Sequence, residues 1–151
     1  MALAAGDRAP LVALNDQNGE GRRSDQLGGK ALVLFFYPKD DTPGCTAEAC
    51  AFRDSYADLQ ALGAEVWGVS GDDQASHQRF ASRHDLPFPL LVDQGNALRK
   101  AFGVPNVLGL LPGRVTYVID GEGVIRRVFN NLLDGAAHRN EARAGLQRLA
   151  L

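Results

Sequence analysis

The sequence is poor in cysteine and histidine, with two cysteines and three histidines among its 151 residues. A structural metal site of the zinc type needs four ligands at suitable spacing. Neither the cysteines nor the histidines, at positions 77, 84 and 138, supply such a pattern. We therefore expect no metal site, and we expect none of the three histidines to be catalytic.

An excess of charge of one sign is also absent, because 16 basic and 18 acidic residues give a formal net charge of -2. This balance gives no reason to expect nucleic acid or an anionic membrane as a partner. No run reaches the roughly 18 uncharged apolar residues of a membrane span. Met1–Pro10 lacks the features of a secretory signal or of an organelle transit peptide. We expect a cytoplasmic protein, in a compartment where thiols are usually kept reduced.

Hydrophobic residues make up 45% of the chain, enough for one domain over residues 1–151 with a sizeable core. Short apolar runs predict buried strands, and amphipathic segments predict helices. Strands and helices alternate first and a hairpin follows, so we predict an α/β fold with a mixed sheet flanked by helices on both faces. The predicted strands are 11–14, 31–37, 66–70, 90–92, 114–119 and 124–129, and the predicted helices begin near 42, 72, 96 and 136.

Both cysteines lie in one segment, Pro38–Cys50, which follows a predicted strand and opens a helix. Thr42 is placed to cap that helix, with Pro43 at its first position. A helix N-terminus lowers the pKa of a thiol from about 8.5, and the thiolate is the nucleophile. Cys45 is therefore the predicted reactive thiol. Gly44 leaves room for a substrate, and the Thr42 hydroxyl can donate to the thiolate or to a bound oxygen atom.

Cys50 follows Cys45 by five positions. In an intact helix this spacing gives about 7.5 Å of rise and about 140° of rotation, so the two Cα atoms are roughly 8.7 Å apart. A disulfide needs about 4.4–6.8 Å between Cα atoms. The pair can therefore bond only if the first helical turns unwind, which describes a reversible switch better than a permanent disulfide. A permanent disulfide and two inert buried thiols are the alternatives.

The segment Tyr37–Asp54 resembles the active-site segment of the peroxiredoxins, and more narrowly of the bacterioferritin comigratory protein or peroxiredoxin Q branch. Pro38, Thr42 and Cys45 match the family pattern of Pro, three residues, Thr, two residues and Cys. Cys50 stands where this branch carries a resolving cysteine. Two further segments extend the resemblance over nearly the whole chain, Gly6–Pro10 and Gly113–Asp120.

The resemblance implies a thioredoxin-like fold with an added N-terminal β-hairpin, and thiol-dependent reduction of hydrogen peroxide and organic hydroperoxides. It implies that Cys45 becomes a sulfenic acid, which Cys50 resolves as an intramolecular disulfide. Thioredoxin or a similar dithiol would reduce that disulfide. No metal, flavin or nicotinamide cofactor is implied, because the electrons arrive through this partner. We expect a monomer or a weak dimer.

The resemblance also assigns the rest of the peroxide site. Thr42 and Arg114 would complete it, and with the Cys45 backbone N–H they would stabilise negative charge on the leaving oxygen. Pro38 would shield the site. Glu48 matches a position that often pairs with and orients the arginine, although a surface glutamate near a helix start is also ordinary dipole matching.

Two other functions use the same thiols. The chain could be a redox sensor or chaperone-like binding protein that changes a partner surface, or a protein disulfide reductase. Outside the cysteine segment, residues 104–113 form an apolar stretch predicted as a loop, which either contacts a partner or substrate or covers the end of the sheet. Phe80 is predicted to be buried, with His77 and His84 solvated on either side of it.

Overall fold

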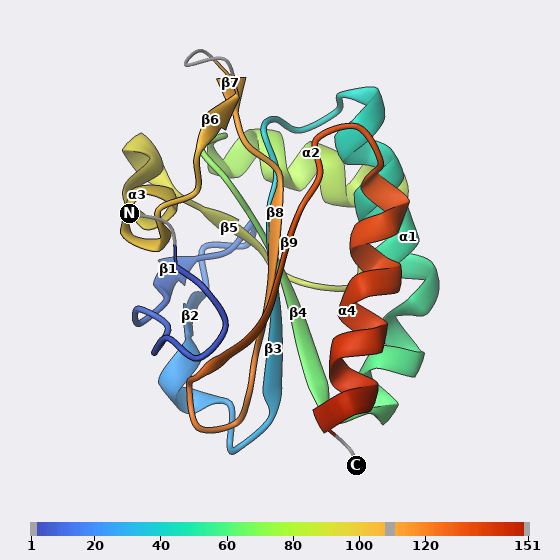
Figure 1. Cartoon of the computed structure of the whole chain (residues 1–151). Helices are drawn as coiled ribbons and strands as arrows, with labels where there is room; N and C mark the ends of the chain where they lie inside the picture. Colours follow the sequence, from blue (N-terminus) through green and yellow to red (C-terminus); the bar gives the residue numbers. More distant parts are fainter. Residues whose placement is uncertain (1–2, 108–110, 150–151) are drawn as a thin grey trace.

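A computed structural model of the chain describes residues 3–107 and 111–149. Its centre is a five-stranded mixed sheet with the strand order β5-β4-β3-β8-β9 (Figure 1). The first three of these strands are parallel to one another, and β8 and β9 run antiparallel to their neighbours. Their bounds are β3 (Ala31–Phe36), β4 (Ala64–Ser70), β5 (Leu90–Val92), β8 (Val115–Ile119) and β9 (Ile125–Asn130).

The middle strand, β3, supplies side chains to two separate cores. Val33 and Phe35 belong to one core, and Leu34 and Phe36 belong to the other. A strand with a neighbour on each side and cover on both faces has no solvated face. The structure therefore explains why the apolar run of β3 is continuous rather than alternating.

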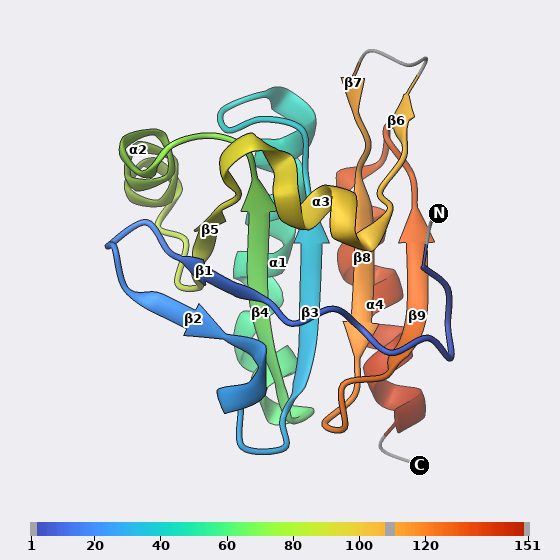
Figure 2. The same cartoon turned by 90° about the vertical axis from the view of Figure 1, so that its left-hand side faces the viewer.

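Helices cover one face of the sheet, and a helix with the N-terminal hairpin covers the other (Figure 2). Helix α1 packs along α4 on the first face. Helix α3 and the β1–β2 hairpin lie across the second face, and α2 lies beside β5 at the sheet edge. The bounds of these elements are α1 (Pro43–Ala61), α2 (Gln74–His84), α3 (Ala97–Phe102), α4 (Gly135–Leu149), β1 (Ala13–Asn15) and β2 (Gly21–Arg23).

The predicted mixed α/β fold and its N-terminal hairpin are confirmed, and most predicted elements differ from the observed ones by one to three residues at their ends. Single-turn 3-10 segments lie at Ser24–Gln26 and Gln94–Asn96. Among the described helices, none is both long and apolar enough to cross a membrane.

The apolar stretch 104–113, predicted as a loop, contains a two-stranded antiparallel ribbon instead. Strand β6 (Asn106–Val107) pairs with β7 (Leu111–Pro112), which gives the backbone groups of both segments hydrogen-bond partners. The two arms approach closely at Gly113, where a Cβ atom would lie 2.3 Å from the carbonyl oxygen of Pro105. Only glycine permits that approach. Residues 108–110 of the predicted loop lie outside the described residues.

The sheet topology brings distant residues to the start of α1. Because β8 runs antiparallel to β3, its first residue, Val115, pairs with Phe36 at the end of β3. Arg114 immediately precedes β8, so the pairing carries it to the segment that leads from β3 into α1. That segment contains Cys45.

Candidate active site

Thr42 occupies the N-cap position of α1 in extended backbone conformation, and Pro43 is the first helical residue. The predicted helix start is therefore confirmed. The Thr42 hydroxyl makes no capping bond to the helix, and instead donates to the carbonyl oxygen of Lys39 at 3.0 Å. The N–H groups of the first helical turn, which contains Cys45, have no acceptor within the helix. They point out of the N-terminal end of α1.

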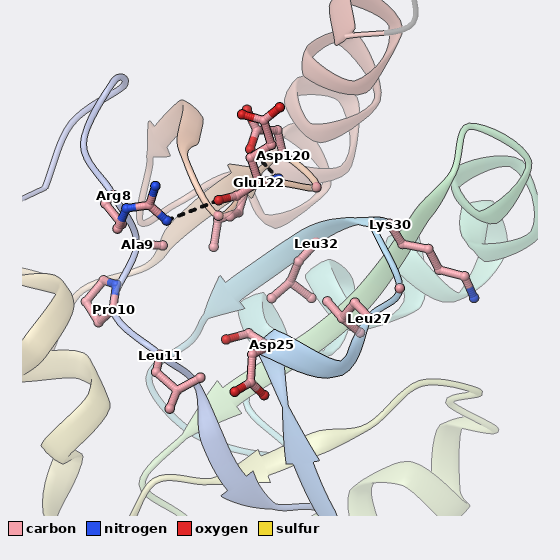
Figure 3. A pocket seen from close by; sticks show the side chains of 16 residues that line it. Arg8, Ala9, Pro10, Leu11, Asp25, Leu27, Lys30, Leu32, Asp120 and Glu122 are labelled. Atoms are coloured by element: carbon pink, nitrogen blue, oxygen red, sulfur yellow. Dashed lines mark hydrogen bonds between the residues drawn. The ribbon is translucent and has the colours of Figure 1, made fainter.

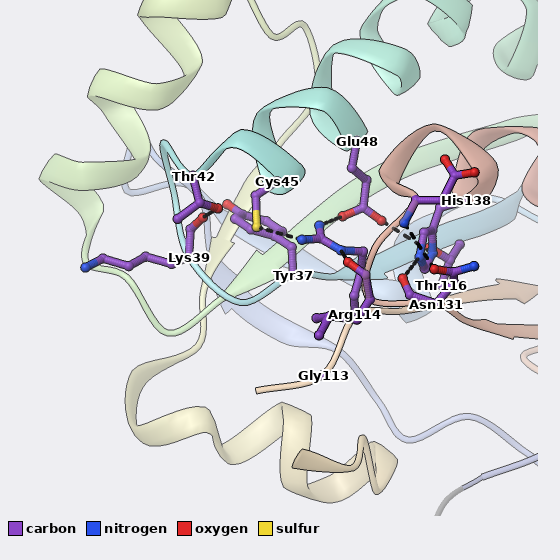
Figure 4. A network of polar contacts seen from close by, with 12 residues as sticks. Tyr37, Lys39, Thr42, Cys45, Glu48, Gly113, Arg114, Thr116, Asn131 and His138 are labelled. Carbon is purple, nitrogen blue, oxygen red and sulfur yellow. Dashed lines mark hydrogen bonds and ion pairs between the residues drawn. The ribbon is translucent and has the colours of Figure 1, made fainter. Parts of the chain in front are cut away.

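A buried ion cluster surrounds the Cys45 sulfur (Figure 4). Arg114 donates from Nη2 to the Cys45 Sγ at 3.3 Å and from Nη1 to the Glu48 Oε1 at 2.7 Å. Its Nε donates to the carbonyl oxygen of Leu132 at 3.0 Å. Cys45, Glu48 and Arg114 are 1%, 0% and 4% exposed. Three acceptors therefore fix the plane of the guanidinium with one edge against the sulfur.

The Arg114 guanidinium lies on the side of Gly44 where a side chain would start, and the role of Gly44 in substrate binding stays a prediction. A Cβ atom at Gly44 would lie 2.9 Å from the Arg114 Nη2. A side chain at position 44 would therefore require the guanidinium to shift from its present position. Pro38, predicted to shield the site, is half-buried at the end of the apolar run of β3.

Burial and charge oppose one another in this cluster. Burial raises the pKa of Glu48 to about 8, and the adjacent Arg114 offsets only part of that effect. Burial by itself lowers the pKa of Arg114, but Glu48 and Cys45 more than compensate, so its pKa is raised. Arg114 therefore faces two acidic groups, and Glu48 contributes more than Cys45 to holding its charge.

Cys50 lies on the same uninterrupted helix as Cys45 and is half-buried. Both cysteines are free thiols. The five-residue spacing keeps the two thiols too far apart to bond while α1 is intact. Cys50 can therefore approach Cys45 only after the helix changes its conformation.

Arg99 is a second buried cation that the sequence did not single out. It donates to the carbonyl oxygens of Gly113 at 2.6 Å and Tyr37 at 2.7 Å. Gly113 immediately precedes Arg114, and Tyr37 precedes the segment that contains Cys45. Arg99 therefore braces the two chain segments that form the site. In the sequence it resembles an ordinary basic residue near the end of a short helix.

His77 is fully buried, so the prediction that it is solvated was wrong. Its Nδ1 lies 2.7 Å from the Asp40 carboxylate and its Nε2 lies 2.8 Å from the carbonyl oxygen of Leu91. Both facing atoms accept, so the ring donates twice and is an imidazolium. Burial alone lowers the pKa of His77, but these acceptors raise it above its ordinary value. The pair joins the segment before α1 to α2.

Asp40, Asp72 and His77 also form a group of potential metal ligands among the described residues, with donor atoms within 4.8 Å of one another. Protein groups already occupy these atoms. The Asp40 carboxylate accepts from the hydroxyls of Tyr37 and Ser76, and Asp72 accepts from the Asp40 backbone N–H. The hydrogen-bonding capacity of these three side chains is therefore used within the protein. Their contacts hold the segment that leads to Cys45 against α2.

A separate cavity of about 410 Å³ lies at the other end of β3 (Figure 3). Lys30 and Leu32 line it from the beginning of the strand, and Asp120 lines it from the β8–β9 turn. Arg8 crosses its rim and donates to the carbonyl oxygen of Glu122 at 3.2 Å. Cys45, beyond the opposite end of β3, does not belong to this cavity.

Comparisons with known proteins identify this arrangement. The sequence model of the AhpC/TSA family matches residues 5–128. A chloroplastic peroxiredoxin Q from Suaeda salsa is 48% identical over 97% of this chain and 69% of its own length. The chain belongs to the peroxiredoxin family.

Solved structures place it near the peroxiredoxin Q branch. The peroxidoxin BcpB from Mycobacterium tuberculosis superimposes with a TM-score of 0.89 and 35% identity, over 97% of this chain and 98% of that one. The bacterioferritin comigratory protein of Xanthomonas campestris, studied for its alkyl peroxide reduction activity, gives 0.85 and 30% over 96% of this chain and 100% of that one. This peroxiredoxin is a thiol-dependent peroxidase of the thioredoxin-like fold, and its family uses peroxide and a thioredoxin-type reductant.

Proposed function

We propose that Cys45 is the thiol that attacks peroxide and that Cys50 resolves the product. The Cys45 thiolate attacks one oxygen of ROOH, the O–O bond breaks, and a sulfenic acid and, after protonation, ROH result. The Cys50 thiolate then attacks the Cys45 sulfur, the S–O bond breaks, and hydroxide leaves as water. A dithiol reductant returns two electrons by thiol-disulfide exchange.

The observation that carries this proposal is the contact of 3.3 Å between the Arg114 guanidinium and the sulfur of a buried cysteine at a helix start. A fixed cation and oriented N–H groups stabilise a thiolate, and they also stabilise negative charge that develops on a leaving oxygen nearby. Because the guanidinium is already held by Glu48 and the Leu132 carbonyl, little reorganisation is needed when the charge moves.

Thr42 has a second role in this proposal. Its hydroxyl donates to the Lys39 carbonyl in the substrate-free protein. We propose that it turns to the peroxide oxygen when substrate enters, and that Pro38 limits water at the same place. A hydroxyl can donate and accept at once, so it suits a group that carries both a proton and lone pairs.

Resolution by Cys50 requires the first turns of α1 to open. That step separates Glu48 from Arg114 and breaks helix-start hydrogen bonds such as the one from the Thr46 N–H to the Thr42 carbonyl, at 2.8 Å. The sulfenic acid itself favours opening, because an added oxygen must be accommodated where Cys45 is 1% exposed.

The finer assignments belong to the same proposal. We propose that hydrogen peroxide and organic hydroperoxides are both substrates, that thioredoxin is the reductant, and that the chain acts as a monomer or weak dimer. We propose that residues 1–151 form one domain, since both cores share the central sheet. We propose a cytoplasmic location because the reaction needs reduced thiols, although the similar plant proteins carry chloroplastic names.

Peroxide turnover coupled to thioredoxin, thioredoxin reductase and NADPH tests the two cysteine roles. Cys45→Ser should abolish turnover, and retained turnover would place the reactive group elsewhere. Cys50→Ser should consume one peroxide per chain and then stall until a small thiol is added. Unchanged thioredoxin-linked turnover in Cys50→Ser would show that another group resolves the sulfenic acid.

The same assay separates the two other functions of such thiols. A redox sensor would be oxidised slowly and without sustained turnover. A protein disulfide reductase would reduce an insulin disulfide with no need for peroxide.

A further inference from the structure

Helix α3 lies across the end of β3 and the beginning of β8, and its Arg99 side chain connects the two segments (Figure 2). The Arg99 Nη1 donates to the carbonyl oxygen of Gly113 at 2.6 Å, and its Nη2 donates to the carbonyl oxygen of Tyr37 at 2.7 Å. The side chain is 3% exposed, and its Nε has no hydrogen-bond partner among the described residues. The two carbonyl groups therefore decide how the guanidinium is oriented.

Both carbonyls belong to peptide groups that lead directly into the site. The Gly113 carbonyl is part of the peptide bond to Arg114, and the Tyr37 carbonyl is part of the peptide bond to Pro38. A peptide group is planar, so a hydrogen bond at its oxygen also fixes the direction in which the next residue leaves. One rigid fork thus orients the backbone at the arginine that contacts Cys45 and at the beginning of the segment that carries Cys45.

The backbone position of Arg114 depends on this contact. Its own carbonyl oxygen accepts from the Asn131 N–H at 3.3 Å, which is a longer bond than the one at Gly113. Gly113 is buried, and its packing against the Pro105 carbonyl oxygen leaves no room for a side chain. Without Arg99, the buried Gly113 carbonyl would lose a charged donor, and the peptide group before Arg114 would be free to rotate.

The fold in turn fixes Arg99. The Asp93 carboxylate accepts from the backbone N–H groups of Leu98 and Arg99 at 2.8 and 2.9 Å, which anchors the beginning of α3. The guanidinium carbon lies 5.7 Å from the centre of the buried Phe36 ring, a distance typical of a cation-π contact. The fork is therefore held in place before any substrate arrives.

Stability alone does not explain an arginine at this position. The ion pairs of the described residues do not include Arg99. Burial lowers the pKa of Arg99, and the charges of Asp93 and Cys45 oppose that effect. Burial of a charge without an ion pair is costly, and a well-packed apolar side chain would stabilise the fold at least as well. The arrangement therefore points to a role in the site.

We propose that Arg99 is a positioning residue for peroxide reduction, because its two hydrogen bonds hold the Arg114 guanidinium in place at the Cys45 sulfur. It acts through Arg114 rather than on the substrate. This inference rests on the proposed role of Cys45 as the attacking thiol. In the sequence, Arg99 is one of two neighbouring basic residues in a short helix, and its partners lie 14 and 62 positions away.

A double-mutant cycle tests whether Arg99 acts through Arg114. The four proteins are the parent, Arg99→Met, Arg114→Gln and both together, all in the Cys50→Ser background, where Cys45 is the only thiol of the chain. The measurement is the second-order rate constant of peroxide consumption in a single turnover. Methionine keeps an unbranched side chain but cannot donate to either carbonyl.

Arg99→Met should lower the rate by about 10- to 100-fold, because misplacement of a reacting group by about 1 Å can cost about 10²-fold. In the Arg114→Gln background, the same substitution should lower the rate by less than about threefold, since only the effect of a more distant charge remains. Equal losses in the two backgrounds, or an Arg99→Met rate within about threefold of the parent, would overturn the inference.

Two further variants separate position from charge. Lys100→Met is the matched control, because Lys100 is the next residue of α3 and is exposed, and it should leave the rate unchanged. Arg99→Lys keeps the charge but not the planar fork, so it should recover only part of the rate that Arg99→Met loses. Full recovery in Arg99→Lys would show that the site needs a charge and not the fork, which would also overturn the inference.

NMR of the Arg114 side chain keeps the test decisive if urea unfolding shows that Arg99→Met is not folded. The Arg114 Nε–H donates to the Leu132 carbonyl at 3.0 Å, so its hydrogen should exchange slowly with water in the parent. Arg99→Lys should speed this exchange, and Lys100→Met should not. Unchanged exchange at the Arg114 Nε–H in Arg99→Lys would contradict the positioning role.

Failure of the inference is distinguishable from failure of the proposed function. If the parent consumes no peroxide, the role of Cys45 is wrong. If the parent consumes peroxide and Arg114→Gln is slow, while Arg99→Met reacts at the parent rate, only the inference about Arg99 is wrong.

Discussion

Replacement of Arg114 tests how much the fixed cation contributes to the reactivity of Cys45. Arg114→Gln keeps a planar side chain of intermediate length but removes the charge. Arg114→Lys keeps the charge but not the fork that contacts the Cys45 Sγ, the Glu48 Oε1 and the Leu132 carbonyl together. The two variants therefore separate the contribution of charge from that of geometry.

The magnitude follows from the distance between charge and sulfur. Two unit charges 3.3 Å apart attract by about 5 kcal/mol at an effective dielectric constant of about 20. Desolvation of the thiolate and the remaining helix N–H groups offset part of this figure. Removal of one preorganised charge-stabilising donor typically costs about 10²–10³ in rate. We expect that loss for Arg114→Gln, and roughly a tenfold loss for Arg114→Lys, in which one charge-assisted contact is weakened.

The assay is the second-order rate constant of peroxide reduction in a single turnover, together with the pH dependence of Cys45 alkylation. Urea unfolding accompanies it, because Arg114 is buried. Arg126→Gln is the matched control, since Arg126 is 48% exposed and pairs with Asp120 far from the sulfur. It should change nothing. A folded Arg114→Gln protein that retains its rate within about threefold would refute the electrostatic argument.

Two predictions concern the packing around the site. Gly135→Ala should lower the free energy of unfolding by about 1–3 kcal/mol and slow peroxide reduction, because its Cβ would press on the backbone of α1. At Gly145 a Cβ atom would lie no closer than 3.2 Å to neighbouring side chains, so Gly145→Ala should lower the free energy of unfolding less than Gly135→Ala does. Equal urea midpoints for the two variants would contradict this account. His77 has a raised pKa, so its pair with Asp40 stabilises the protein fully below the ordinary pKa of about 6.5, and the contribution is lost as pH rises through the raised value. The stability difference between the parent and His77→Phe should therefore shrink with increasing pH, and a growing difference would show that the imidazolium is not the stabilising form.

The sequence predicts what depends on neighbours along the chain. The apolar run of β3, the position of Thr42 before Pro43 and the spacing of Cys45 from Cys50 are local signals, and each has its counterpart in the structure. They suffice to locate the proposed reactive thiol and the helix that the proposed mechanism requires to open.

Contacts between distant segments could not be predicted from local signals. Arg114 reaches Cys45 only because β8 pairs antiparallel with β3, and the family resemblance rather than any periodicity pointed to it. His77 looked solvated because its partner, Asp40, lies 37 positions away. The position of Glu48 near a helix start predicted an exposed side chain, but α4 packs over it and buries it. Gly135, which has no side chain, allows α4 to approach Glu48 this closely.

The central claim is that α1 is both the site of chemistry and the part that moves. Hydrogen-deuterium exchange of the reduced protein, and of the protein oxidised with one equivalent of peroxide, tests it directly. Mass spectrometry of the same samples should find an intramolecular disulfide between Cys45 and Cys50. The account predicts faster exchange over residues 42–52 after oxidation and unchanged exchange in β3. A Cys45–Cys50 disulfide with unchanged exchange over residues 42–52 would contradict it.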